Sequence, residues 1–145
     1  MKLALITSIV GLFVVGAGAP AATAGATGLK ANPKRVNFGT RAVGTFTVKG
    51  STITNTTSSD VVVQTSAVRM PDQFSWGLLP GQTCPILAPG ILPAGASCDI
   101  VTGFFPQEFF VGLEDLAVLQ VTATDPSTGA LVDSVQVEFR GVAKR

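Results

Sequence analysis

The fold of this chain is decided by one stretch, Cys84-Pro-Ile-Leu-Ala-Pro-Gly-Ile-Leu-Pro-Ala-Gly-Ala-Ser-Cys98-Asp-Ile-Val-Thr-Gly-Phe-Phe-Pro106. It holds the only two cysteines of the sequence, separated by a loop rich in proline and glycine. After the loop, Cys98, Ile100, Thr102 and Phe104 share one face of a predicted strand, because side chains alternate between the two faces of a strand. Pro106 ends that strand, since proline has no N–H to donate to a neighbouring strand.

The rest of the chain repeats this design of short alternating segments separated by glycine and proline turns. In the last segment Val135, Val137 and Phe139 face inward, and the polar residues between them face outward. No segment after residue 24 has a sustained 3.6-residue apolar period. These features predict an all-β fold, an antiparallel seven-stranded immunoglobulin-like β-sandwich that forms one domain. Strands are expected at residues 33–39, 46–55, 61–68, 74–76, 98–105, 119–123 and 134–140.

Two local irregularities are expected in these strands and turns. Phe46 and Val48 share one parity of their strand whereas Ile53 has the other, which predicts a β-bulge near Gly50 and Ser51. Residues 125–129, Asp-Pro-Ser-Thr-Gly, carry the residue types that hairpin loops favour.

The first residues of the chain predict an export signal. Lys2 precedes an apolar segment at residues 3–15, and a run of small residues follows. We place cleavage after Ala24, with Ala26 as the alternative, which makes residues 1–24 a signal peptide, 25–32 a flexible leader and 33–143 the folded domain. A transmembrane anchor is the rival interpretation, but the apolar segment is short for a bilayer and no basic flank follows it.

The two cysteines of an exported chain most simply form one disulfide between Cys84 and Cys98. Two free buried thiols and a redox pair are the alternatives, and a redox pair usually lies at a helix start, which is absent here. A bridge that closes a loop of this length stabilises a domain by roughly 3 kcal/mol in the chain-entropy model. It explains how so long an irregular loop is tolerated.

Charge and composition exclude several classes of function. The chain has ten basic and nine acidic residues, and loss of Lys2 with the signal balances them. Nucleic-acid binding requires clustered Lys and Arg, and membrane-surface binding requires a basic amphipathic helix, so neither partner is expected. The sequence contains no His and no Tyr, which excludes Ser-His-Asp and Cys-His catalysis and zinc sites that use His.

Carboxylates are the remaining candidates for chemistry. Asp99, Glu108, Glu114 and Asp115 are scattered rather than arranged in a calcium loop, and acids on a sandwich are usually solvated. We therefore expect no enzyme activity, metal or cofactor. Asn55-Thr-Thr57 matches a glycosylation sequon, which we interpret as turn chemistry.

The order of the motifs resembles the bacterial immunoglobulin-like domains of the ASPM–SPD-2–hydin (ASH) group, also described as choice-of-anchor D. The resemblance covers roughly residues 29–143 and implies a seven-stranded sandwich that serves as a structural or adhesive module without an active site. Two features depart from the pattern: residues 70–89 are longer and richer in proline, and Thr102 replaces an aliphatic residue. The matching landmarks are Pro33, Val36, Phe38-Gly39, Val43-Gly44, Ile53-Thr-Asn-Thr56, Leu92-Pro-Ala-Gly95-Ala-Ser-Cys98-Asp-Ile100, Phe104-Phe-Pro106, Gly112, Leu119, Val121, Val137, Phe139 and Gly141.

Aromatic and apolar side chains supply the candidate binding surface. A contiguous exposed apolar patch marks a recognition site, and loops on a rigid sandwich are where such sites usually lie. For Phe109 and Phe110 the favoured interpretation is that they cap the end of the core where the chain changes sheets, and the binding surface is the rival interpretation. The candidate residues are Phe74, Trp76, Leu78, Leu79, Phe105, Phe109 and Phe110.

These observations favour a secreted or cell-envelope module, non-catalytic, that binds a protein or an envelope component through loops or a sheet edge. The alternative is a periplasmic chaperone or assembly factor that pairs an edge strand with its client. Pro33 and Lys34 at the predicted first strand could either prevent another strand from pairing with the sheet edge or leave that edge available for strand addition. An enzyme would need a concave pocket with convergent polar groups, which the composition does not suggest.

Overall fold

The structure is a computed structural model that describes residues 28–145. The predicted signal peptide, both candidate cleavage positions and the first residues of the predicted leader lie outside the described residues.

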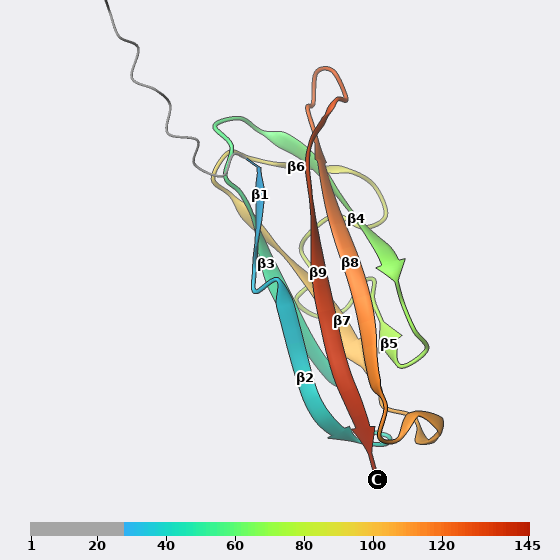
Figure 1. Ribbon diagram of the computed structural model, residues 1–145. Helices are drawn as coiled ribbons and strands as arrows, with labels where there is room; N and C mark the ends of the chain where they lie inside the picture. The colour runs from blue at the N-terminus through green and yellow to red at the C-terminus, as the bar shows by residue number, and fades with distance from the viewer. Residues whose placement is uncertain (1–27) are drawn as a thin grey trace, which may run out of the picture.

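Two β-sheets face each other, as Figure 1 shows, and apolar side chains fill the space between them. One sheet has the strand order β1-β3-β7-β5 and the other the order β2-β9-β8-β4-β6. The immunoglobulin-like sandwich architecture that the sequence predicts is therefore present. The elements are β1 Leu29–Asn32, β2 Arg35–Ala42, β3 Thr47–Asn55, β4 Val61–Arg69, β5 Phe74–Ser75, β6 Gly90–Leu92, β7 Ser97–Phe104, the 3₁₀ turn η1 Glu108–Phe110, β8 Glu114–Thr124 and β9 Leu131–Lys144.

The described residues form nine strands, which corrects the predicted count of seven. One additional strand is β1, which pairs with β3 and lies where we expected a flexible leader, so the folded domain begins before residue 33. The other is β6, whose three residues pair with the start of β4 inside the proline-rich loop. Both strands are stabilised by pairing with a strand that is distant in the sequence. They have only four and three residues, which is too few for a clear alternating pattern.

One strand pair corrects the prediction of a wholly antiparallel sandwich. β2 pairs with β9 in parallel, and every other strand pair is antiparallel. The chain changes sheets at Pro33, so that β1 lies against β3 and β2 against β9. β2 and β9 then run in the same direction, which makes their pairing parallel.

The predicted bulge near Gly50 and Ser51 is absent, because β3 pairs with β7 in unbroken register. The parity break has a different explanation. Phe46, just before β3, lies on the outer face of the sheet, where its ring approaches Gly103. On the inward parity, buried Ser51 donates a hydrogen bond from its Oγ to the Pro33 carbonyl over 2.7 Å. Polar Ser51 is therefore accommodated in the interior without a slip.

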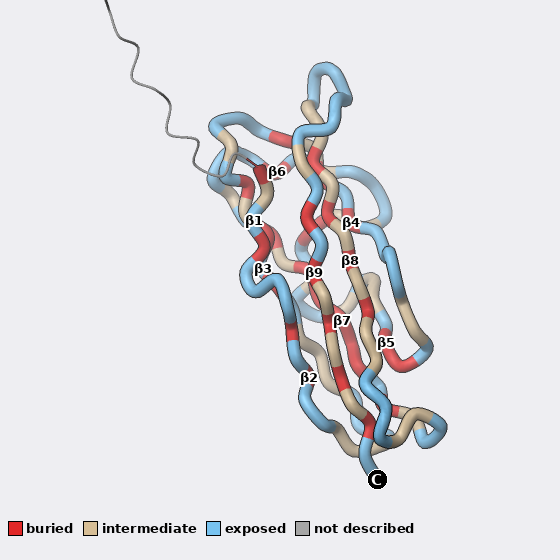
Figure 2. The backbone as a smooth tube through the Cα atoms, in the orientation of Figure 1, coloured by how far each residue is buried: buried red, intermediate tan, exposed pale blue. Residues whose placement is uncertain are grey.

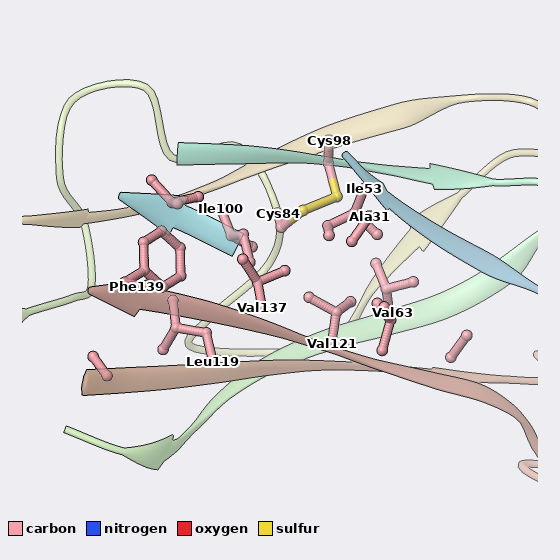
Figure 3. Close-up of a cluster of buried hydrophobic side chains, with 14 of the residues drawn as sticks. Ala31, Ile53, Val63, Cys84, Cys98, Ile100, Leu119, Val121, Val137 and Phe139 are labelled. Carbon is pink, nitrogen blue, oxygen red and sulfur yellow. A yellow bond between two sulfur atoms is a disulfide. The ribbon is translucent and has the colours of Figure 1, made fainter. Parts of the chain in front are cut away.

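The core is built from alternate residues of both sheets (Figures 2 and 3). Ile53 and Ile100 come from one sheet and Leu119 and Val137 from the other, and all four are fully buried. This burial is the main source of stability, since each buried aliphatic side chain contributes roughly 1.5–3 kcal/mol relative to exposure. In the same core the rings of Phe38, Phe74 and Phe104 pack against one another, with centroids 4.8–5.8 Å apart.

The hairpin between β8 and β9 forms at the residues where turn chemistry predicts it. The Asp125 N–H donates to the Ala130 carbonyl over 2.8 Å, and Gly129 has a φ of +70°. The Asp125 carboxylate also accepts hydrogen bonds of 2.8 Å from the backbone N–H groups of Ser127 and Thr128. Glycine and aspartate thus meet the backbone requirements of this turn.

Candidate functional site

The disulfide between Cys84 and Cys98 is present, which confirms the predicted pairing. Both cysteines are buried, with the bridge directed into the core beside Ile53 and Ile100 (Figure 3). Cys84 is also the only buried residue between Ser75 and Ile91. The long loop therefore has one buried anchor, and that anchor is the sulfur bridge.

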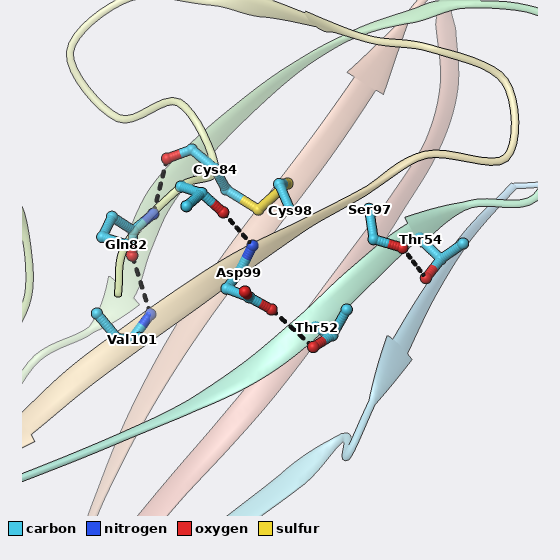
Figure 4. The surroundings of a disulfide bond; sticks show 9 residues. Thr52, Thr54, Gln82, Cys84, Ser97, Cys98, Asp99 and Val101 are labelled. Carbon is cyan, nitrogen blue, oxygen red and sulfur yellow. Dashed lines mark hydrogen bonds between the residues drawn. A yellow bond between two sulfur atoms is a disulfide. The ribbon is translucent and has the colours of Figure 1, made fainter. Parts of the chain in front are cut away.

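Residues 82–85, which we name the clasp, lie along the edge of β7 and take the place of a neighbouring strand. The Thr83 and Cys84 N–H groups donate to the Asp99 carbonyl over 3.0 and 2.9 Å. In return the Asp99 N–H donates to Thr83 Oγ1 over 2.7 Å, and the Val101 N–H donates to Gln82 Oε1 over 2.9 Å (Figure 4). Side chains thus supply acceptors that a strand would supply from its backbone.

The clasp also reaches the other sheet. The Thr65 N–H on β4 donates to the Pro85 carbonyl over 2.9 Å. Since β4 and β7 belong to different sheets, residues 82–85 connect the two layers along one side of the sandwich. The first part of the predicted recognition loop is therefore structural.

The predicted surface residues before the clasp separate into three environments. Phe74 is buried in the core against Phe38 and Phe104, so its assignment to a binding surface is wrong. Phe74 lies on the inward face of β5. The sequence could not show this, because a strand of two residues is too short to reveal which positions alternate inward. Trp76 is half-buried and packs against the core, Leu79 is half-buried, and Leu78 is exposed.

The predicted residues after β7 are more exposed. Phe105 is 44% exposed, Phe109 is 93% exposed and Phe110 is half-buried. The favoured interpretation, in which Phe109 caps the core, is therefore wrong. Phe105 comes directly before Pro106, and Phe109 and Phe110 follow it in η1, close to the carboxyl end of β9 (Figure 1).

Sequence reasoning missed two further apolar residues at this end, Phe46 and Leu113, which are 55% and 58% exposed. The Gly44 N–H donates to the Pro106 carbonyl over 3.1 Å, which joins the turn before Phe46 to the segment after β7. The parity break at Phe46 was the available signal, and we had explained it by a bulge. We name the four side chains Phe46, Phe105, Phe109 and Leu113 the aromatic end.

The four carboxylates considered for chemistry do not converge. Arg145 Nε contacts Glu108 at 2.6 Å, Arg140 pairs with Glu114 at 3.3 Å, and Thr52 donates to Asp99 over 2.6 Å. Residues 28–145 contain no group of three or more His, Cys, Asp or Glu that could hold a metal ion, and they enclose no pocket. No helix in this described part is long and apolar enough to cross a membrane.

Asn55 of the formal sequon serves the turn that we expected. Its side chain is fully buried, and Nδ2 donates to the carbonyls of Ser59 and Leu92 over 2.9 and 3.0 Å. Its Oδ1 accepts from the Thr57 N–H over 3.0 Å. An amide engaged in this way organises the backbone after β3.

Side chains also occupy the outer edge of β2. Lys49 Nζ donates to the Asn37 carbonyl over 2.7 Å, and Arg41 Nε donates to the Phe38 carbonyl over 2.7 Å. The register shift between Asn37 and Gly39 adds a bulge at the same place. Charged side chains and bulges are devices that protect sheet edges from pairing with another strand.

No protein-family model and no curated protein matches the sequence. Among solved structures, the fold is similar to the ASH / PapD-like domain 7 of human CEP192, with a TM-score of 0.59, 14% identity, and 96% of this chain and 97% of that chain covered. It is also similar to WR4, an MSP family member of Caenorhabditis elegans, with a TM-score of 0.50, 11% identity, and coverage of 79% and 96%.

A third similar structure is the Escherichia coli chaperone DraB, with a TM-score of 0.54 and 15% identity. The alignment covers 79% of this chain and 54% of DraB, so the chain spans about half of that chaperone. At these identities the likeness concerns the fold. The chain therefore has the immunoglobulin-like fold of ASH and PapD-like domains, which is the resemblance that its motifs predict.

Proposed function

We propose that this chain is a secreted or cell-envelope binding module, without catalytic activity, that recognises a protein partner through its aromatic end. The observation that carries the proposal is the near-complete exposure of Phe109, with Phe46, Phe105 and Leu113 exposed at the same end. Exposed apolar side chains that gather at one place are typical of interaction sites, and aromatic residues dominate their energetics.

Export is supported by two independent features. The sequence begins with a segment that has the composition of a signal peptide, and the domain is closed by a disulfide, which persists in oxidising compartments. A non-catalytic role is supported by the lack of His and Tyr in the sequence and by the separation of the carboxylates, since Glu108 and Glu114 pair with different arginines and Asp99 accepts a hydrogen bond from Thr52.

The chaperone alternative depends on a sheet edge that accepts or lends a strand. The clasp occupies the edge of β7, and Lys49 and Arg41 occupy that of β2. The end of β4 is exposed, but its register shifts between Ala67 and Arg69. The aromatic end is thus a better-supported contact surface than any of these three edges.

The test is affinity capture with the purified domain from envelope extract of its own organism, followed by quantitative mass spectrometry. Phe109→Ser is expected to reduce recovery of the specific partner at least about tenfold, the loss typical of an interface hot spot. Leu131→Ser is the matched control, because Leu131 is 67% exposed at the opposite end of the sandwich, and it should leave recovery unchanged. Equal recovery with both variants would refute the aromatic end as the contact surface.

Leu78→Ser provides a second arm for the long loop, which the sequence favoured as the recognition surface. If Leu78→Ser abolishes capture and Phe109→Ser does not, the loop rather than the aromatic end binds the partner. Both side chains are exposed and leave the core unchanged, so a loss of binding is separable from a loss of folding.

A further inference from the structure

We propose that the clasp is a built-in cover for a strand-accepting edge, and that the chain without its disulfide pairs through β7 with a second copy of itself. This inference concerns a different surface from the aromatic end and is independent of the proposed partner. It rests on the hydrogen bonds between residues 82–85 and β7 and on the single buried anchor of the loop.

The edge of β7 beneath the clasp has the groups that strand pairing requires. The N–H groups of Asp99 and Val101 and the carbonyl of Asp99 all point away from β3, toward residues 82–84. β5 pairs with Phe104 and Gly103 but ends there, and the clasp bonds the next two edge residues, Val101 and Asp99. Without the clasp, these backbone groups form an open edge of the kind that recruits another strand.

Attachment of the clasp depends on the bridge. Cys84 is the only buried residue in the segment from Ser75 to Ile91, and the remaining contacts to β7 are hydrogen bonds at the edge of the sheet. Proline and glycine are frequent in this loop, so its backbone has little tendency to form a strand by itself. Without the covalent bond, the hydrogen bonds of the clasp are left to hold the loop on β7, and the conformational entropy of a long loop opposes them.

A second copy is the occupant that the edge fits. Asp99 and Val101 present their N–H groups on the same side, so two β7 edges can pair antiparallel around Ile100 by a two-fold axis. In that register Asp99 of each copy lies opposite Val101 of the other, and the two carboxylates do not face each other directly. The bonds that the clasp makes within one chain are then made between chains.

The bridge forms when a disulfide-bearing oxidant accepts two electrons and two protons from the thiols of Cys84 and Cys98. One S–S bond forms in the chain, and the oxidant leaves as a dithiol. Before this step the exported chain exposes the β7 edge, and after it the edge is covered. Oxidation thus separates a self-pairing form from a monomeric form.

The test compares full chains by analytical ultracentrifugation and amide hydrogen exchange. The double variant Cys84→Ala/Cys98→Ala is expected to sediment as a dimer at concentrations where the bridged chain is a monomer. Adding Val101→Pro should restore the monomer, because proline removes the N–H of Val101 and this group donates to Gln82 rather than to β3. A monomeric double variant, or assemblies that Val101→Pro does not dissolve, would overturn the proposal.

A second variant covers the case in which loss of the bridge prevents folding. Gln82→Leu/Thr83→Val keeps the disulfide and removes both side-chain acceptors of the clasp. The amides of Asp99 and Val101 should then exchange about tenfold faster, while amides of β9 stay protected and the chain stays a monomer, because the bridge still holds Cys84 beside β7. Unchanged exchange at these two amides would show that the clasp does not cover the edge.

Discussion

The backbone N–H of Phe105 donates a hydrogen bond to the backbone carbonyl of Gln73 over 2.7 Å, and the side chain of Gln73 is completely buried. Gln73 Oε1 accepts from the Gln107 N–H over 3.1 Å, and Nε2 donates to Asp115 Oδ2 over 3.3 Å. One glutamine therefore positions the segment that carries Phe105 and Phe109 against β8. A polar core residue thereby supports an apolar surface.

Gln73→Leu is expected to destabilise the domain by about 1–3 kcal/mol, because the half-buried Gln107 N–H and Asp115 Oδ2 lose the hydrogen bonds that Gln73 supplies. Urea unfolding followed by tryptophan fluorescence measures the change. The matched control is Gln136→Leu on the exposed face of β9, where an effect within about 0.5 kcal/mol is expected. Similar losses from both substitutions would contradict the role of Gln73.

Gly141 and Gly103 offer a second comparison, since a Cβ at either position would lie 2.5 Å from a phenylalanine ring. Gly141 faces the ring of Phe104, which is fully buried, whereas Gly103 faces the ring of Phe46, which is largely exposed. Gly141→Ala should therefore cost about 1–3 kcal/mol through overpacking of the core.

Gly103→Ala should cost less than Gly141→Ala, because Phe46 can rotate toward solvent. Thermal unfolding of the two variants side by side tests the difference. A loss from Gly103→Ala as large as that from Gly141→Ala would show that Phe46 or Ser75, which a Cβ at Gly103 would also meet, cannot move aside.

Alternation and turn chemistry were sufficient to predict much of this fold. β7 and β9 alternate over several residues, so their inward faces were assigned correctly from Ile100, Phe104, Val137 and Phe139. Cys84 and Cys98 are the only cysteines, which left one possible bridge. Such signals are local or unique in the sequence, and they do not depend on knowing which strands pair.

The features that sequence reasoning missed depend on tertiary pairing. β1 has only Leu29 and Ala31 as an alternating signal, and its strand conformation comes from pairing with β3. In the clasp, the side chains of Gln82 and Thr83 replace backbone acceptors, an arrangement that has no periodicity to read. Phe46 disturbed the alternating pattern of the predicted strand, because it is an apolar residue that lies on the outer face of the sheet.

The buried bridge should resist reduction in the folded protein. Both cysteines are almost inaccessible to solvent, so a reductant reaches the sulfur atoms only when the domain opens. Incubation with dithiothreitol and an alkylating reagent in native buffer should leave the mass unchanged, whereas the same treatment in urea should label both cysteines. Labelling in native buffer at the rate seen in urea would mean that the clasp is not closed.

The hairpin between β8 and β9 carries a pH-dependent interaction. Backbone hydrogen bonds from Thr128 and Ser127 lower the pKa of Asp125 below its ordinary value of 3.8. Because the folded-state pKa is depressed, the stabilising effect is fully present above pH 3.8 and is lost as the pH falls through the lower folded value.

An NMR titration of the Asp125 carboxyl carbon should therefore give a midpoint below 3.8 in the folded protein. Asp125→Asn keeps an oxygen acceptor for Ser127 and Thr128 but has no titrating group, so the amide shifts of both residues should lose their acid transition. Because Asp125 lies in a hairpin loop at the surface, the whole domain should unfold at the same pH with either residue. A midpoint at or above 3.8 would show that these hydrogen bonds do not favour the charged form.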